Sequence, residues 1–195
     1  MRIKSGMLLG AVVLLSACGA AQLPWAPDER VAKASYRLSG AATVTLLTVI
    51  ANDSGSAGHS ALLINGSQRV LYDPAGTWYN HDVPERADLL YGMTPQMMQN
   101  YLDYHARKRF HVVKQTKVVS PQVAEQMIVL AKQMGASANG MCAQNTSAIL
   151  SQTPGFEGFP VSVWPKSAVE AFSRIQGSKT EKVYQDDEGK TDLNA

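Results

Sequence analysis

The dipeptide Asn65-Gly66 constrains the fold of this chain more than any other feature of its sequence. It lies between two apolar runs, Gly58 to Ile64 (GHSALLI) and Gln68 to Tyr72 (QRVLY). Asn-Gly between such runs is the strongest short-range signal for a β-hairpin, because both residues tolerate the left-handed backbone of a tight turn. The sequence therefore predicts two antiparallel strands, the second of which ends in the turn Asp73-Pro74-Ala75-Gly76.

Two further strands are predicted by apolar, β-branched composition, from Ala42 to Ala51 and from Phe110 to Val119. Two helices should begin where a capping residue precedes proline. They run from Thr94-Pro95 to about Arg109 and from Ser120-Pro121 to Gly135. Shorter helices are expected from about Met141 to Leu150 and from Pro165 to Ile175.

Strands fill the first half of this pattern and helices most of the second half. Such an order favours an α+β fold, in which helices cover one face of an antiparallel sheet. We expect a single domain at 40–176, which is long enough to bury its own core. Residues 18–39 contain two prolines and no sustained period, and they are interpreted as a tether. Residues 177–195 are polar and are interpreted as a disordered tail.

The N-terminus has the features of a secretory signal. Arg2 and Lys4 precede a short apolar stretch, Met7 to Leu15, which small residues follow. A spanning helix needs about 20 apolar residues, so this stretch is too short to be one. We therefore interpret residues 1–17 as a signal peptide that is removed.

The residues Leu15-Ser16-Ala17-Cys18-Gly19 resemble a bacterial lipoprotein box. The resemblance implies cleavage before Cys18 and acylation of that cysteine, and several buried acyl chains give stable membrane anchoring. Gly19, in place of Asp, favours the outer membrane facing the periplasm by the same resemblance. If Cys18 is not acylated, it is free to form a disulfide with Cys142.

Charge argues against a nucleic-acid partner. The whole chain has a formal charge of +2, and removal of residues 1–17 takes away Arg2 and Lys4 but no acid, which leaves a formal charge of 0. A domain without net positive charge lacks the electrostatic footprint of nucleic-acid binding.

Cys142 is the first candidate for chemistry, because it is the only other cysteine in the chain. It lies beside Gly140 at the start of a predicted helix, where the helix dipole and free amides favour a thiolate. The same amides suit the oxyanion that forms when a carbonyl is attacked. The alternative is a buried cysteine that acts only as a small hydrophobic residue.

His59 is the candidate base for that thiol, since imidazole has the appropriate pKa. It precedes an apolar run, so a purely structural role at a strand edge is the alternative. Asp73 ends the neighbouring strand of the hairpin and is the candidate that orients His59. Asp-Pro is also ordinary turn chemistry, and Asn65 and His81 are weaker substitutes for this role.

The order of these elements resembles the circularly permuted papain-like superfamily, which includes permuted NlpC/P60 peptidases and lecithin-retinol-acyltransferase-like proteins. The histidine strand precedes the cysteine helix, and the likeness spans about Ala42 to Phe172. It implies that Cys142 is a nucleophile, His59 its base and Asp73 the orienting residue. Many members have Asn directly before the cysteine, whereas this chain has Met141 there.

The resemblance implies a hydrolase that acts through a thiolate on amide, ester or thioester bonds. An envelope location makes peptidoglycan peptides the leading substrate and lipid acyl groups the second. A lipid acyltransferase or deacylase would have an apolar cleft, with Trp78, Phe156 and Phe159 as candidate lining residues. The alternative from another class is a non-catalytic envelope lipoprotein that acts in binding or assembly. The sequence leaves the oligomeric state open.

No cofactor is expected. The four histidines, at 59, 81, 105 and 111, show no metal-ligand spacing. Gly55 and Gly58 fit no phosphate-binding loop, and neither Ser60 nor Ser147 lies in a Gly-x-Ser-x-Gly elbow.

Overall fold

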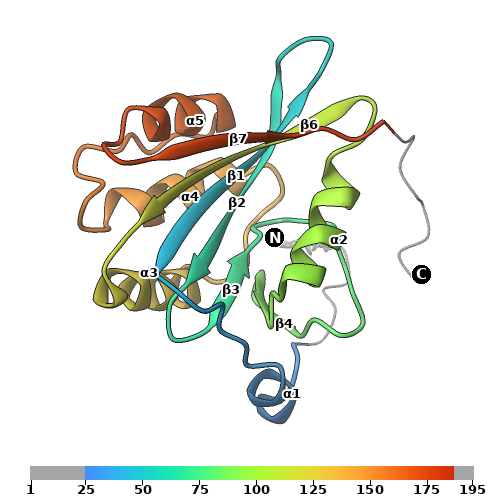
Figure 1. Cartoon of the computed structure of the whole chain (residues 1–195), viewed down its shortest axis with the longest axis vertical. Coiled ribbons are helices and arrows are strands. Elements are labelled where there is room, and N and C mark those ends of the chain that lie inside the picture. Colours follow the sequence, from blue (N-terminus) through green and yellow to red (C-terminus); the bar gives the residue numbers. More distant parts are fainter. Residues whose placement is uncertain (1–24, 187–195) are drawn as a thin grey trace, which may run out of the picture.

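The computed structural model describes residues 25–186, so the predicted signal peptide and Cys18 lie outside the described residues. Its core is a sheet of seven antiparallel strands in the order β4-β5-β3-β2-β1-β6-β7 (Figure 1). The strands are β1 (Thr43–Ala51), β2 (Ala57–Asn65), β3 (Arg69–Tyr72), β4 (Glu85–Arg86), β5 (Leu89–Tyr91), β6 (Phe110–Val118) and β7 (Lys179–Val183). The helices are α1 (Asp28–Lys33), α2 (Pro95–His105), α3 (Pro121–Met134), α4 (Cys142–Ser151) and α5 (Pro165–Ser173).

The α+β prediction, an antiparallel sheet packed against helices, is confirmed. The two proline-preceded caps act as expected, since the Thr94 side chain accepts from Met97 N and the Ser120 side chain from Val123 N, each at 3.2 Å. Within residues 25–186, no helix is long and apolar enough to cross a membrane.

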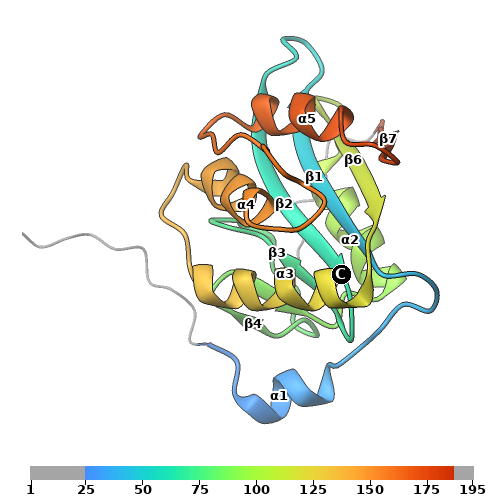
Figure 2. The same cartoon turned by 90° about the vertical axis from the view of Figure 1, so that its left-hand side faces the viewer.

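The helices lie on both faces of the sheet, whereas the sequence predicted that one face is covered. α3, α4 and α5 cover one face and α2 covers the other (Figure 2). Alternation along the strands makes this possible, because successive side chains point to opposite faces. In β2, Leu62 and Ile64 belong to the cluster with α3–α5, and Ala61 and Leu63 to the cluster with α2.

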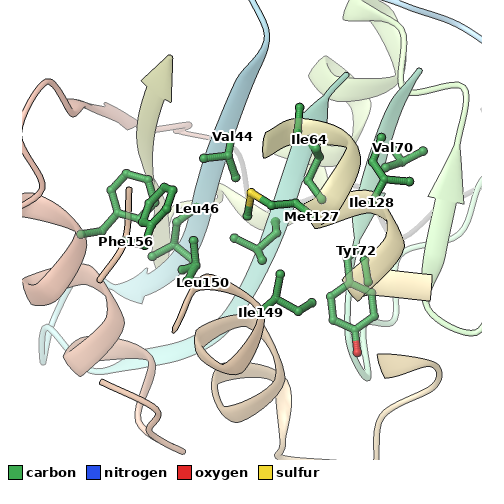
Figure 3. Packing of buried hydrophobic residues seen from close by; sticks show 14 of the residues in the cluster. Val44, Leu46, Ile64, Val70, Tyr72, Met127, Ile128, Ile149, Leu150 and Phe156 are labelled. Carbon is green, nitrogen blue, oxygen red and sulfur yellow. The ribbon is translucent and has the colours of Figure 1, made fainter. Parts of the chain in front are cut away.

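The larger core fills the space between the sheet and α3–α5 (Figure 3). Leu46, Ile64 and Tyr72 from the strands contact Met127 of α3 and Leu150 of α4 there, and all five side chains are fully buried. The smaller core lies under α2 and includes Tyr101 and Trp78.

The described parts of both flanking segments, 25–39 and 177–186, contribute to the domain, in contrast to the expected tether and disordered tail. Residues 25–39 include α1, and the chain before it is held by hydrogen bonds, from Ala26 N to Glu85 O at 2.9 Å and from Arg86 Nε to Ala26 O. In the tail, β7 pairs with the edge strand β6. The sequence did not predict these elements, because both segments are polar and the main-chain hydrogen bonds that attach a strand to a sheet edge require no apolar pattern.

The hairpin forms, but Asn65 is not in its turn. Asn65 pairs with Arg69 as the last residue of β2, so the connection is three residues, 66–68. The Asn65 side chain is buried, and it accepts a hydrogen bond from Leu38 N and donates one to Leu38 O, both at 3.1 Å. This side chain therefore fastens the segment before β1 to the domain.

We expect Asn65→Ala to lower the free energy of unfolding by about 1–3 kcal/mol, because it leaves buried main-chain groups at Leu38 without partners. Urea denaturation of residues 25–186 measures the loss, with the exposed Lys132→Ala on α3 as control. A change no larger than that of the control would contradict this role of Asn65.

Candidate active site

The first half of β2 has a strand neighbour on one side only. β2 pairs with β1 along its length, but its ladder with β3 covers only Leu62 to Asn65. The chain leaves the sheet after β3 at Asp73, and the start of α4 packs against β2. The hydroxyls of Ser60 and Thr146, 3.1 Å apart, lie in that contact. Thus β2, the turn after β3 and the N-terminus of α4 come together.

The structure brings His59 and Asp73 together at this place. His59 Nε2 lies 2.7 Å from Asp73 Oδ1, and the side chains are 17% and 4% exposed. The same carboxylate oxygen accepts a hydrogen bond of 2.8 Å from the hydroxyl of Tyr101, on α2. Asp73 is thereby fixed between a strand and a helix and can orient the imidazole.

Cys142 is the first residue of α4 and is a buried, free thiol. It shares a side-chain hydrogen bond with His59. The backbone amides of Ser60 and Ala143 also lower the pKa of the thiol. All three predicted residues therefore form one connected cluster.

The cluster favours a charged pair of thiolate and imidazolium. Burial lowers the pKa of His59, but hydrogen bonds to Asp73 and Cys142 outweigh burial and raise it from 6.5 to about 10. Burial raises the pKa of the Cys142 thiol, but the hydrogen bond and charge of His59 bring it below its ordinary 9.0. The pKa of Asp73 is also lowered, because His59 outweighs the effect of burial.

The start of α4 supplies donors for an oxyanion. Met141 precedes the helix without a side-chain cap, and the first intrahelical hydrogen bond is donated by Asn145, to Met141 O at 3.0 Å. The amides of Cys142 and Ala143 precede this bond, and amides at a helix N-terminus stabilise negative charge. A carbonyl oxygen beside Cys142 could accept from them during attack.

A β-bulge lies directly before His59. Val49 of β1 pairs with His59 and Ile50 with Ala57, so Gly58 is an extra residue in β2. Bulges bend a strand and change the direction of nearby side chains, and they are frequent beside active sites. A methyl group built on Gly58 meets no atom within 4 Å, so the space beside this residue is open.

Tyr101 and His105 belong to the site, although the sequence did not single them out for it. The rings of His105 and His59 are parallel, with 5.7 Å between centroids and 8° between planes. Burial lowers the pKa of His105 to about 4, so this ring is neutral when His59 is charged. The sequence feature that could have grouped Tyr101 with His105 is their spacing, since residues four apart lie on one face of a helix.

Other candidates lie elsewhere. Asn65 is at the opposite end of β2, and His81 is exposed, with its Nδ1 3.2 Å from Asp82 Oδ1. The predicted cleft residues Phe156 and Phe159 are buried in the core, where their ring centroids are 6.4 Å apart. Their burial contradicts the expectation that they line a cleft.

A cavity of about 830 Å³ lies beside the cluster. Its walls include Ala75 and Gly76, which follow Asp73, and Asn139, three residues before Cys142. Its lining also includes Trp25, Arg30, Trp78, Tyr79, Glu85 and Asp88. Cys142 and His59 do not line it, so the cavity adjoins the reactive groups through the loops that carry them.

Comparison of the chain with protein-family models, curated proteins and solved structures gave no match. In the part of the chain that the structure describes, no group of three or more His, Cys, Asp or Glu side chains is arranged to hold a metal ion.

Gly76 leaves room for the Asp73 carboxylate, because a methyl group on residue 76 would overlap Asp73 Oδ2. We expect Gly76→Ala to displace Asp73 from His59 and to lower the pKa of His59 from about 10, since burial then dominates. An NMR titration of the His59 ring measures this. Gly58→Ala is the control, because the same methyl group meets open space there. An unchanged His59 titration in Gly76→Ala would contradict the dependence on Asp73.

Proposed function

We propose that this protein is a cysteine hydrolase in which Cys142 is the nucleophile, His59 the general acid and base, and Asp73 the orienting residue. One observation carries the proposal. The His59 ring is hydrogen-bonded through Nε2 to a buried carboxylate and also interacts with a thiol at the start of a helix. A base that is oriented by a third group and contacts the nucleophile is the arrangement that nucleophilic catalysis needs.

The proposed reaction begins with attack of the Cys142 thiolate on the carbonyl carbon of an amide, ester or thioester. The negative charge that forms on oxygen is stabilised by the first amides of α4. The His59 imidazolium donates its proton to the leaving amine, alcohol or thiol, and a thioester to Cys142 remains. His59 then removes a proton from water as the water attacks the thioester. The acid is released, Cys142 leaves as the thiolate, and His59 is the imidazolium again.

We assign the domain to a permuted papain-like arrangement. The support is the chain order, with the histidine on β2 ahead of the cysteine at the start of α4, on one antiparallel sheet. Met141 differs from the asparagine that many members have. Here it closes the loop before α4 through Met141 N, which donates to Ala138 O at 3.1 Å.

We further propose that the protein is an envelope lipoprotein acylated at Cys18 and held at the outer membrane, facing the periplasm. The signal-like N-terminus and the lipoprotein-like box support this location. The membrane is then a partner through the acyl chains, and the substrate is a peptide or acyl compound of the cell envelope.

A peptidoglycan peptide is the substrate class that we favour. The cavity carries polar groups that suit a peptide, including Arg30, Glu85 and Asn139. A lipid acyl group is the second candidate, and it is supported by the aromatic rings of Trp25, Trp78 and Tyr79 in the same cavity.

Alkylation of Cys142 by iodoacetamide between pH 4 and 10 tests the thiolate–imidazolium pair. In a form that lacks residues 1–18, we expect an apparent pKa below 9.0, because His59 stabilises the thiolate. His59→Ala should move it upward, since burial alone raises the pKa of the thiol. An unreactive thiol, or identical profiles in both proteins, would refute catalysis and support a protein that acts in binding or assembly.

Hydrolysis of muropeptides and of short-chain acyl esters tests the reaction and separates the two substrate classes. We expect Cys142→Ala to reduce turnover to the background rate, and Asp73→Asn to reduce kcat/KM by about 10²-fold or more through misorientation of His59. Activity should rise with pH as Cys142 loses its proton and fall as His59 deprotonates near pH 10. Lys132→Ala, on the surface of α3, is the control. Turnover retained in Cys142→Ala would refute the nucleophile.

A further inference from the structure

Asp88 connects the two loops that carry the proposed catalytic groups. Its carboxylate Oδ2 accepts a hydrogen bond of 2.8 Å from Ala75 N, in the turn after Asp73, and one of 2.7 Å from Ser137 N, in the loop before Cys142. Its main-chain oxygen accepts from Asp73 N at 2.8 Å. One residue outside the cluster thus contacts both arms of the site.

The backbone around Asp88 is held in an unfavourable conformation. In residues 25–186, the residues other than glycine with positive φ are Ala75, Ala87 and Asp88, with φ of 55°, 49° and 64°. Ala87 and Asp88 form the two-residue turn between β4 and β5, and Ala75 is bonded to Asp88. Such conformations cost about 1–3 kcal/mol each and persist where the surroundings determine them. All three lie at this one junction.

Tyr72 provides a second attachment for the loop before Cys142, but it holds the two ends of this region. The middle of the loop is held by Asp88. α3 ends at Met134, and the carbonyl of the C-cap residue Gly135 accepts a hydrogen bond of 2.9 Å from the hydroxyl of Tyr72. Asn145 Nδ2 of α4 donates to the same hydroxyl at 3.2 Å. Tyr72 therefore fixes the beginning of the loop and the body of α4, and Asp88 fixes Ser137 between them.

We propose that Asp88 is a positioning residue, which holds the loop before Cys142 against the turn after Asp73 and so sets the contact between the thiol and His59. This inference rests on the proposed function. Asp88 acts through Ser137 and Ala75 and touches neither sulfur nor imidazole in the contacts of the described residues.

The sign of the effect separates positioning from charge. Loss of a carboxylate removes negative charge near the site, and that alone lowers the pKa of a thiol. Displacement of the loop before Cys142 weakens the hydrogen bond from His59, and this raises the pKa of the thiol. Glu85 is the other carboxylate at this turn, where burial and the charge of Asp88 raise its pKa, and it is unchanged in the variants below.

Two substitutions at residue 88 separate these effects. Asp88→Gly removes the carboxylate, and glycine accepts the left-handed backbone, so the turn is preserved. Asp88→Asn removes the charge but keeps an oxygen that can accept both hydrogen bonds, and Asn also tolerates this backbone. Asp82→Asn, an exposed carboxylate in the preceding loop, is the control for charge.

The measurement is the iodoacetamide profile of Cys142, with circular dichroism to check folding. We expect Asp88→Gly to raise the apparent pKa of the thiol and to slow alkylation at pH 6 by about tenfold, with little change at pH 10. Asp88→Asn keeps both hydrogen bonds and loses only charge, so the apparent pKa of the thiol should stay the same or fall. Asp82→Asn should retain the wild-type profile. An unchanged or lowered pKa in Asp88→Gly would overturn the proposal, as would the same increase in Asp88→Asn.

The two proposals fail in different ways. A wild-type thiol that titrates normally refutes the catalytic pair itself, whereas a shifted wild-type thiol that is insensitive to Asp88→Gly refutes only the role of Asp88. If Asp88→Gly does not fold, hydrogen exchange in the unchanged protein decides. Slow exchange of the Ala75 and Ser137 amides is expected, and rapid exchange of both would overturn the proposal.

Discussion

The site depends on one buried carboxylate. Asp73 is 4% exposed, and an ionised carboxylate is costly to bury unless donors or a cation compensate for lost water. His59 and Tyr101 provide that compensation at a single oxygen, at 2.7 and 2.8 Å. The contact with Asp73 raises the pKa of His59, and the charged imidazole in turn lowers that of Cys142. The contact between the Asp73 carboxylate and His59, which outweighs burial, thus favours the charged forms of both groups.

The sheet creates the space for this cluster by ending one ladder early. Because β3 pairs with β2 only from Leu62 to Asn65, the chain can turn away at Asp73 and α4 can approach β2. The bulge at Gly58 changes the strand just before His59. Tyr101 of α2 and Cys142 of α4 can then reach the same Asp73–His59 pair, although α2 and α4 cover opposite faces of the sheet.

Most elements were predictable, because their signals are local. Proline after a capping residue set the starts of α2 and α3, and apolar β-branched runs set β1 and β6. The short strands β4, β5 and β7 were missed, because two to five residues held by main-chain hydrogen bonds carry no such signal. α1 was missed for a related reason, since none of its residues is buried.

The sequence by itself determined the fold class and named the three residues, since a lone thiol at a helix start and a histidine beside a hairpin are local patterns. Only the tertiary structure decided that these groups meet, and that Tyr101, His105, Gly76 and Asp88 surround them. The physical reason is separation along the chain. Cys142 reaches His59 only through packing of α4 on β2, and no period or motif encodes which residues of distant segments will face one another across that contact.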